Sequence, residues 1–320
     1  MGRHVAGELP ELDRLVDDAC AEIGREIEAL RVPRLAGVVL AGGYGRGEGG
    51  ARACGDGMLP KLSNDLDFFA IAGKGSSDSD AAAIAAALEP VSRRWTEKLG
   101  IDVDFTARTP WRLKHDEERI MVQELLRGYC DVAGAKGEEL FAGIERRPAE
   151  AIPWMEAARL LMNRGMGLLF AMERRDAGFV ARNINKCILG AGDAFLVSRG
   201  LYRWRAEERA AELKAQGDDG LYARAIAWKF RPADEPVCDW ETARETWLNG
   251  HLEVIAAVDG MGYRRTLRNA ARWLVRRRSV GNLRTFALDP VVRVLDAVER
   301  HVRTRTAPGG SLMRDWNVFN

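Results

Sequence analysis

Four aspartates stand in two closely spaced pairs, each within an apolar stretch: Asp65 and Asp67 in NDLDFF, and Asp102 and Asp104 in IDVDFT. Side chains two residues apart on a β-strand project from the same face, so each pair places two carboxylates side by side. Neighbouring carboxylates repel one another in a dry site, and a bound divalent cation removes that repulsion. Oxygen ligands select Mg²⁺, with Mn²⁺ as the alternative, over zinc, so the two pairs predict a magnesium site.

Two acidic strands in one small domain gather three or four carboxylates at one place. Such a ligand set holds two Mg²⁺ ions about 3.5–4 Å apart, which stabilise the attacking and the leaving oxygen of an in-line displacement at phosphorus. The aspartates therefore point to chemistry at a phosphate group.

A glycine-rich stretch precedes the first acidic pair. The ten residues 41–50, AGGYGRGEGG, hold six glycines and only two charges, Arg46 and Glu48, and they follow an apolar run. Glycine is kept where the backbone approaches another group closely or takes positive φ. A turn of backbone N–H groups beside a metal site cradles phosphate oxygens, and the Arg46 guanidinium adds a bidentate cation. The stretch therefore predicts a phosphate-binding turn.

The order GGYGRGE, then SNDLDFF, then an acidic strand resembles the nucleotidyltransferase superfamily, which includes DNA polymerase beta, antitoxin-type nucleotidyltransferases and aminoglycoside nucleotidyltransferases. The resemblance covers residues 36–106 and implies an α+β fold with a small mixed sheet and helices. It implies that Gly42 and Gly43 form the turn that binds the β- and γ-phosphates. It also places Arg46 in the Arg-Gly-Glu motif of that family.

The resemblance further implies the metal ligands. Asp65 and Asp67 would hold both metal ions, and Ser63, which precedes Asn64, preserves the part of the motif that comes before the first aspartate and is expected in the nucleotide site. A third acid, Asp104 or Asp102, would hold the ion that activates the acceptor hydroxyl and would take its proton. We favour Asp104 because its strand ends sooner after it, and both acids stay open.

Periodicity predicts the elements that position these residues. Residues 8–30 have the apolar spacing of an amphipathic helix, and a short apolar strand precedes the glycine turn. Each acidic pair lies on a predicted strand, and a helix that Gly100 closes lies between the two strands. Residues 51–62 have no period and predict an inserted loop that lines the site.

From Pro153 onward the apolar spacing is helical almost throughout. We therefore expect a catalytic domain at residues 1–150, followed by an all-helical domain at residues 151–320 that clamps substrate and nucleotide. A GxGxxG pattern runs through Gly45, Gly47 and Gly50, but no helical pattern follows it, so a dinucleotide fold is not favoured.

Two basic features in the helical half carry predictions. Lys186, Gly190 and Asp193 share one helix face, and the resemblance makes Lys186 the candidate ligand of the triphosphate. The alternative is an ordinary surface pair of Lys186 with Asp193. A second face bears Arg264, Arg268, Arg272 and Arg276, a stripe that either binds RNA, an anionic glycan or an acidic partner, or is simply a solvated face.

Composition narrows the class of protein. The net charge of +1 excludes a chain dominated by attraction to nucleic acid or membranes, and there is no run of 18 apolar residues and no apolar secretory stretch. Five scattered cysteines and four isolated histidines support neither a disulfide framework nor a zinc site. We expect a cytoplasmic protein with no membrane partner.

These observations predict a Mg²⁺-dependent enzyme that transfers a nucleoside monophosphate from a nucleoside triphosphate to an acceptor hydroxyl and releases pyrophosphate. The resemblance to antibiotic-modifying members favours a small hydroxylated acceptor. A protein side chain or an RNA 3′ end is the alternative acceptor. A non-catalytic nucleotide-binding or regulatory module is the alternative from another class.

Overall fold

A computed structural model describes residues 2–55, 58–260 and 290–318 and divides the chain into two compact units. The first unit comprises Met1–Arg147 together with Lys229–Pro232, and the second comprises Pro148–Trp228 and Ala233–Asn320. The arginine stripe from Arg264 to Arg276 lies outside the described residues.

The first unit is built on a four-stranded sheet of order β5-β4-β1-β6. Strand β1 (Leu35–Leu40) pairs antiparallel with β4 (Leu66–Ala72) and with β6 (Cys130–Gly134), whereas β4 pairs parallel with β5 (Val103–Arg108). The sheet is therefore mixed, and the predicted α+β class is confirmed.

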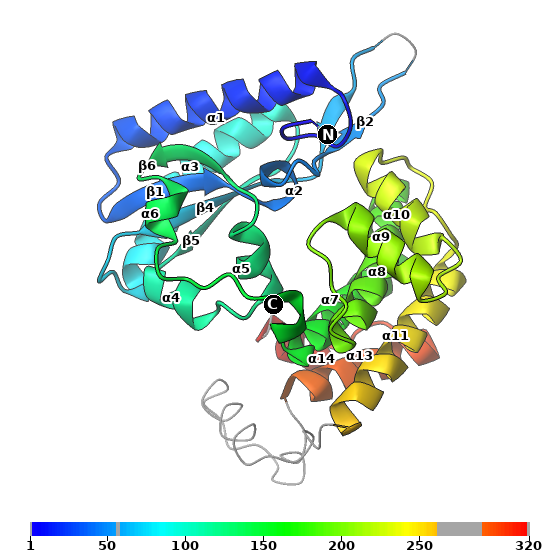
Figure 1. The fold of residues 1–320 in the computed structure, drawn as a ribbon. Helices are drawn as coiled ribbons and strands as arrows, with labels where there is room; N and C mark the ends of the chain where they lie inside the picture. Colours follow the sequence, from blue (N-terminus) through cyan, green and yellow to red (C-terminus); the bar gives the residue numbers. More distant parts are fainter. Residues whose placement is uncertain (1, 56–57, 261–289, 319–320) are drawn as a thin grey trace. The chain divides into compact units, whose positions relative to one another are not determined.

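Helices cover both faces of this sheet (Figure 1). The apolar faces of α1 (Pro10–Leu30) and α3 (Asp78–Leu99) pack on one side against the alternate residues Leu66, Phe68 and Ala70 of β4. The short helices α4 (Pro110–His115), α5 (Ile120–Leu125) and α6 (Gly137–Leu140) pack on the other side against Phe69 and Ile71. Because side chains alternate along a strand, Asp67 belongs to this second face.

Two local predictions need correction. The glycine turn is one turn of helix, α2 (Gly42–Gly45). Residues 51–62 are not wholly a loop, because β2 (Gly50–Arg52) and β3 (Lys61–Ser63) pair antiparallel at the two ends of the segment. Strands of three residues are too short to show an apolar alternation, which is why periodicity did not reveal them. Strand β2 begins at Gly50, where a dinucleotide fold would require a helix, so the structure agrees that this is not a dinucleotide fold.

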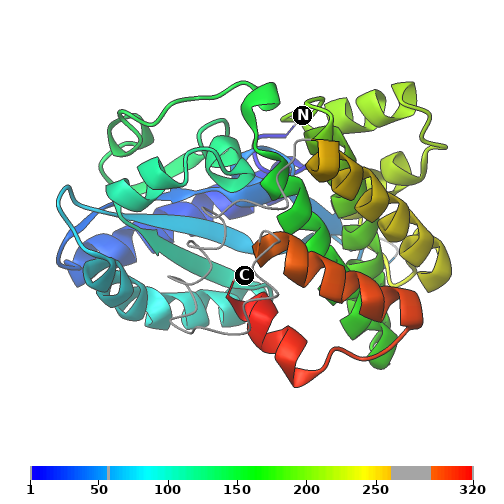
Figure 2. The same cartoon turned by 90° about the horizontal axis from the view of Figure 1, so that it is seen from below.

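The described part of the second unit is helical, as expected (Figure 2). Helices α7 (Trp154–Glu173) and α8 (Ala177–Ser198) pack along one another, and α11 (Trp240–Gly260) packs on both. The remaining elements are η1 (Ala149–Ala151), α9 (Ala206–Ala215), α10 (Leu221–Phe230, of which Lys229 and Phe230 belong to the first unit), α13 (Pro290–Thr304) and α14 (Gly310–Asn317). Across residues 2–55, 58–260 and 290–318, no helix combines the length and the apolar character needed to span a membrane.

Candidate active site

The parallel register of β4 and β5 places Asp67 directly beside Asp104, because the two residues are Cα partners. Asp65 and Asp102 lie two residues earlier, each just ahead of its strand, where the Leu66 N–H donates a 2.8 Å hydrogen bond to the Asp102 carbonyl. Asp67 and Asp104 lie on their strands, and their side chains leave the sheet on the face that carries α5. Register, which no local pattern encodes, thus joins the two acidic pairs at one end of the parallel strands.

The charges of these carboxylates interact. Partial loss of water raises the pKa of Asp104, and the negative charges of Asp65, Asp102 and Glu89 raise it further. The ionised form of the Asp104 carboxyl is therefore unfavourable until a cation binds beside it. Within the described ranges, no three His, Cys, Asp or Glu side chains are gathered as a ready metal centre. Carboxylates repel one another when no cation lies between them. The assignment of Asp65, Asp67 and Asp104 as metal ligands stays a prediction.

Gly42 fits closely against Asp67. The Ala41 N–H donates a 2.8 Å hydrogen bond to the Asp67 carbonyl, which brings the start of α2 beside the acidic strand. Gly42 has φ of +60°, and a Cβ atom at this position would stand 2.2 Å from Oδ2 of Asp67. Glycine is therefore required both by the backbone conformation and by the carboxylate that it touches.

The residues before Asp65 are shaped by an unusual backbone. Asn64 has φ of 72°, in the left-handed region that asparagine tolerates better than most residues. Ser63 ends β3, and its Oγ is buried without a hydrogen-bond partner among the described residues. The Tyr44 hydroxyl, which accepts the Ser63 N–H at 3.0 Å, joins this strand to α2. Ser63 is thus next to the acidic pair with a hydroxyl that a ligand could satisfy.

Arg46 is enclosed by carboxylates of its own unit. Its Nε lies 3.7 Å from Glu48 Oε2 and its Nη1 lies 3.2 Å from Glu124 Oε2, and the three side chains are between 2% and 17% exposed. Lys229, which belongs to the same unit, lies 3.2 Å from Glu48. These pairs identify a structural role for Arg46 that its motif did not suggest, and its role as a phosphate ligand stays a prediction.

Replacing Arg46 by methionine should lower the free energy of unfolding by about 3 kcal/mol, because Glu48 and Glu124, both largely buried, lose the guanidinium that lies beside them. Urea unfolding of the protein without nucleotide or metal measures this loss. The matched control is Arg93→Met, whose partner Glu89 and own side chain are 57% and 70% exposed, so that a loss under about 1 kcal/mol is expected. Equal stability of the two variants would assign Arg46 to ligand binding alone.

Comparison with known proteins finds a likeness among solved structures alone. No family model matches the chain, and no curated protein matches it. Among solved structures, the chain is similar to spectinomycin adenyltransferase AAD(9) from Enterococcus faecialis, crystallised with ATP and spectinomycin. The sequences are 14% identical, the similarity covers 73% of this chain and 98% of that one, and the TM-score is 0.42. A likeness at this level does not bear on the activity of this chain.

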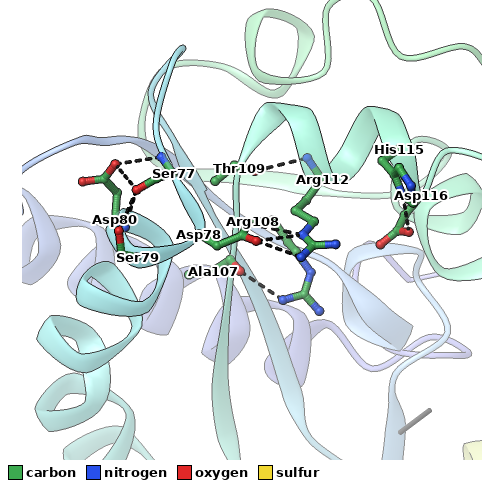
Figure 3. A network of polar contacts seen from close by, with 10 residues as sticks. All are labelled: Ser77, Asp78, Ser79, Asp80, Ala107, Arg108, Thr109, Arg112, His115 and Asp116. Carbon is green, nitrogen blue, oxygen red and sulfur yellow. Dashed lines mark hydrogen bonds and ion pairs between the residues drawn. The ribbon is translucent and has the colours of Figure 1, made fainter. Parts of the chain in front are cut away.

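A second polar network lies at the opposite end of β5 from Asp104 (Figure 3). Ser77 caps α3 by accepting the Asp80 N–H, and Arg112 of α4 binds the Asp78 carboxylate with a shortest distance of 2.8 Å. These contacts satisfy a helix end and join two helices. The network therefore supports the fold and does not extend the acidic site.

Lys186 lies on α8 in the helical unit, together with Asp193. Asp193 does not depend on Lys186 for its partners, because it accepts hydrogen bonds from the Tyr222 hydroxyl and pairs with Arg209 Nε at 3.0 Å. The assignment of Lys186 to the triphosphate stays a prediction.

Proposed function

We propose that this chain is a metal-dependent nucleotidyltransferase, which moves a nucleoside monophosphate from a nucleoside triphosphate to an acceptor hydroxyl and releases pyrophosphate. The observation that carries the proposal is the register that sets Asp67 beside Asp104 while Gly42 packs against the Asp67 carboxylate. Acidic side chains and a glycine turn far apart in the chain thereby meet at one end of the sheet.

The donor set fits Mg²⁺. Its side chains are carboxylates, which suit a hard cation. Loss of water, and after it the charges of neighbouring carboxylates, raise the pKa of Asp104, and a cation would relieve that repulsion. Asp65 and Asp67 would hold both ions, and Asp104 would hold the ion nearer the acceptor. When bound, the ions supply electrostatic stabilisation to the phosphate oxygens.

The remaining steps are assigned to this chain's own groups. The first N–H groups of a helix have no partner inside it, so those of Gly42 and Gly43 are suited to the β- and γ-phosphates, with the Ser63 hydroxyl beside them. Asp104 would accept the proton of the acceptor hydroxyl, and its raised pKa makes it a stronger base than an ordinary aspartate. The hydroxyl oxygen then bonds to the α-phosphorus as the bond to pyrophosphate breaks.

We further propose a small hydroxylated molecule as the acceptor and the helical unit as the part that clamps nucleotide and substrate. The near-neutral charge of the chain supports this choice over RNA, because an RNA-binding protein gains most of its affinity from cations. A protein side chain is the remaining acceptor class, and one experiment distinguishes all three.

The test is incubation of the protein with each of four α-³²P-labelled nucleoside triphosphates, Mg²⁺ and a bacterial metabolite extract. Label should move to a small molecule with the wild type and not with Asp65→Ala/Asp67→Ala. Label on protein or RNA would replace the proposed acceptor. If nucleotide binds equally with and without Mg²⁺ and no label moves, the chain is a binding module and the catalytic proposal fails.

Lys186→Ala should weaken the binding of a nucleoside triphosphate about tenfold, since one charge-assisted hydrogen bond to the phosphates is lost. The affinity for the matching monophosphate should not change. Calorimetry measures both, and Lys214→Ala, at an exposed lysine of α9, is the control. Equal losses for the two nucleotides would show that Lys186 does not contact the triphosphate tail.

A further inference from the structure

The glycine stretch is shaped in part by a segment that the sequence analysis leaves without a role, Gly2–Gly7. The Ala6 N–H donates to the Gly49 carbonyl and the Gly49 N–H donates to the His4 carbonyl, each at 2.9 Å. A Cβ atom on Gly49 would stand 2.7 Å from the His4 carbonyl oxygen and 2.3 Å from the Tyr44 ring. At least this glycine therefore serves close packing of the chain on itself.

One carboxylate of α1 holds the segment in place. Asp13 accepts the backbone N–H groups of Arg3, His4 and Val5 at 2.8–2.9 Å. Partial burial acts to raise the pKa of Asp13, but these hydrogen bonds outweigh it and lower the pKa. The carboxylate therefore stays ionised and keeps all three bonds at neutral pH. The segment thus has a defined position beside α2.

His4 makes the contact that reaches α2. Its side chain is 1% exposed; Nδ1 lies 3.2 Å from the Tyr44 carbonyl oxygen, and Nε2 lies 3.0 Å from Oδ1 of Asp17 in α1. The Cys130 sulfur of β6 lies 4.0 Å from Nδ1, and Arg3 also binds Asp17, at 2.8 Å. Both ring nitrogens face acceptors, and only an imidazolium can donate from both.

The charge of the ring follows from these neighbours. Burial acts to lower the pKa of His4, but hydrogen bonding to Cys130 and Asp17 outweighs it, so the pKa rises from 6.5 to about 9. The groups that face the ring are Asp13 and Asp17 of α1, the Cys130 side chain of β6, and Arg3, which pairs with Asp17. The imidazolium is therefore the form present at neutral pH.

We propose that His4, as an imidazolium, is a positioning residue for the glycine turn: it binds the Tyr44 carbonyl of α2 and the Asp17 carboxylate of α1 together. A helix of four residues is not stable by itself, so α2 must be held from outside. The Tyr44 hydroxyl is bound to β3, and His4 binds the carbonyl of the same residue. A cation near the C-terminal end of a helix also interacts favourably with the helix dipole. The inference rests on the proposed role of α2 in binding phosphate.

The proposal predicts a pH dependence of fixed sign. A histidine whose pKa is raised on folding stabilises its surroundings fully below 6.5, and the effect is lost as the pH rises through about 9. Above that value a neutral ring donates from only one nitrogen, so the turn should loosen and the affinity for a nucleoside triphosphate should fall.

The test combines NMR titration of His4, hydrogen exchange at the amides of residues 42–48, and calorimetry with ATP and Mg²⁺. His4→Leu should speed exchange of the Gly45 amide, which donates to Ala41, and should weaken ATP binding about tenfold. His4→Asn keeps a donor near the Nδ1 position without a titrating ring. Because the asparagine cannot bind Asp17 as well, this variant should bind ATP at pH 7 as weakly as the wild type does above pH 9, and its affinity should not change between pH 7 and pH 9.

His115→Asn, at an exposed histidine, is the control and should change none of these readings. Cys130→Val should shift the His4 titration to lower pH, because the side-chain hydrogen bond with Cys130 helps to raise the pKa of His4. Unchanged exchange and affinity in His4→Leu, or a pH dependence that persists in His4→Asn, would overturn the proposal. If the wild type binds no ATP, the proposed function fails, whereas the exchange and titration results still decide the role of His4.

Discussion

Asp104→Asn should reduce nucleotidyl transfer by about 10³-fold, whereas Asp102→Asn should reduce it by less than about tenfold. The amide removes the negative charge beside Asp67 and the group proposed to accept the proton of the acceptor hydroxyl. Asp104 is the Cα partner of Asp67, while Asp102 lies ahead of the strand and uses its carbonyl to bind the Leu66 N–H. Rates of label transfer from the α-³²P-nucleotide measure both variants.

The two substitutions control for one another, because they make the same chemical change at positions two residues apart. The unfolding temperature without metal is a second, independent measurement. The raised pKa of Asp104 means that its ionised form destabilises the fold as the pH rises, so Asp104→Asn should increase the unfolding temperature at pH 7. A larger loss of transfer in Asp102→Asn would assign the third ligand to Asp102 and refute the argument from register.

What the sequence predicts well in this chain is local. Asp67 and Asp104 lie on apolar strands, so the face from which each side chain leaves follows from the pleat alone. Asp65 and Asp102, which were also expected on these strands, lie one residue ahead of them. The apolar spacing of α1 and of the helical half is likewise a property of neighbouring residues. These are the elements that the structure confirms.

What the sequence does not predict depends on pairing between distant residues. Arg46 matches a motif, but its partner Glu124 lies in a short helix of a region, residues 108–148, where no apolar period is long enough to recognise. The same region supplies β6, against which β1 is paired, and its five residues are too few for a clear pattern. His4 is similar, since nothing near it in sequence indicates Tyr44 or Cys130.

Gly42→Ala should reduce transfer by about 100-fold, because a carboxylate at the reacting centre would be displaced by about 1 Å. The new Cβ would stand 2.2 Å from Oδ2 of Asp67, so Asp67 or the first turn of α2 must move to restore an ordinary contact. Substitution at φ of +60° also adds backbone strain of about 1 kcal/mol. Transfer rates and urea unfolding together measure the two effects.

Gly75→Ala separates the strain from the displacement. Gly75 has φ of +79°, comparable to that of Gly42, but nothing lies within 4 Å of the position that its Cβ would take. This variant should therefore lose about 1 kcal/mol of stability and keep full activity. If Gly42→Ala lost stability to the same extent and kept its activity, the contact of α2 with Asp67 would have no part in the reaction. The glycine would then be a requirement of the backbone alone, and the glycine turn would lose its place in the proposed site.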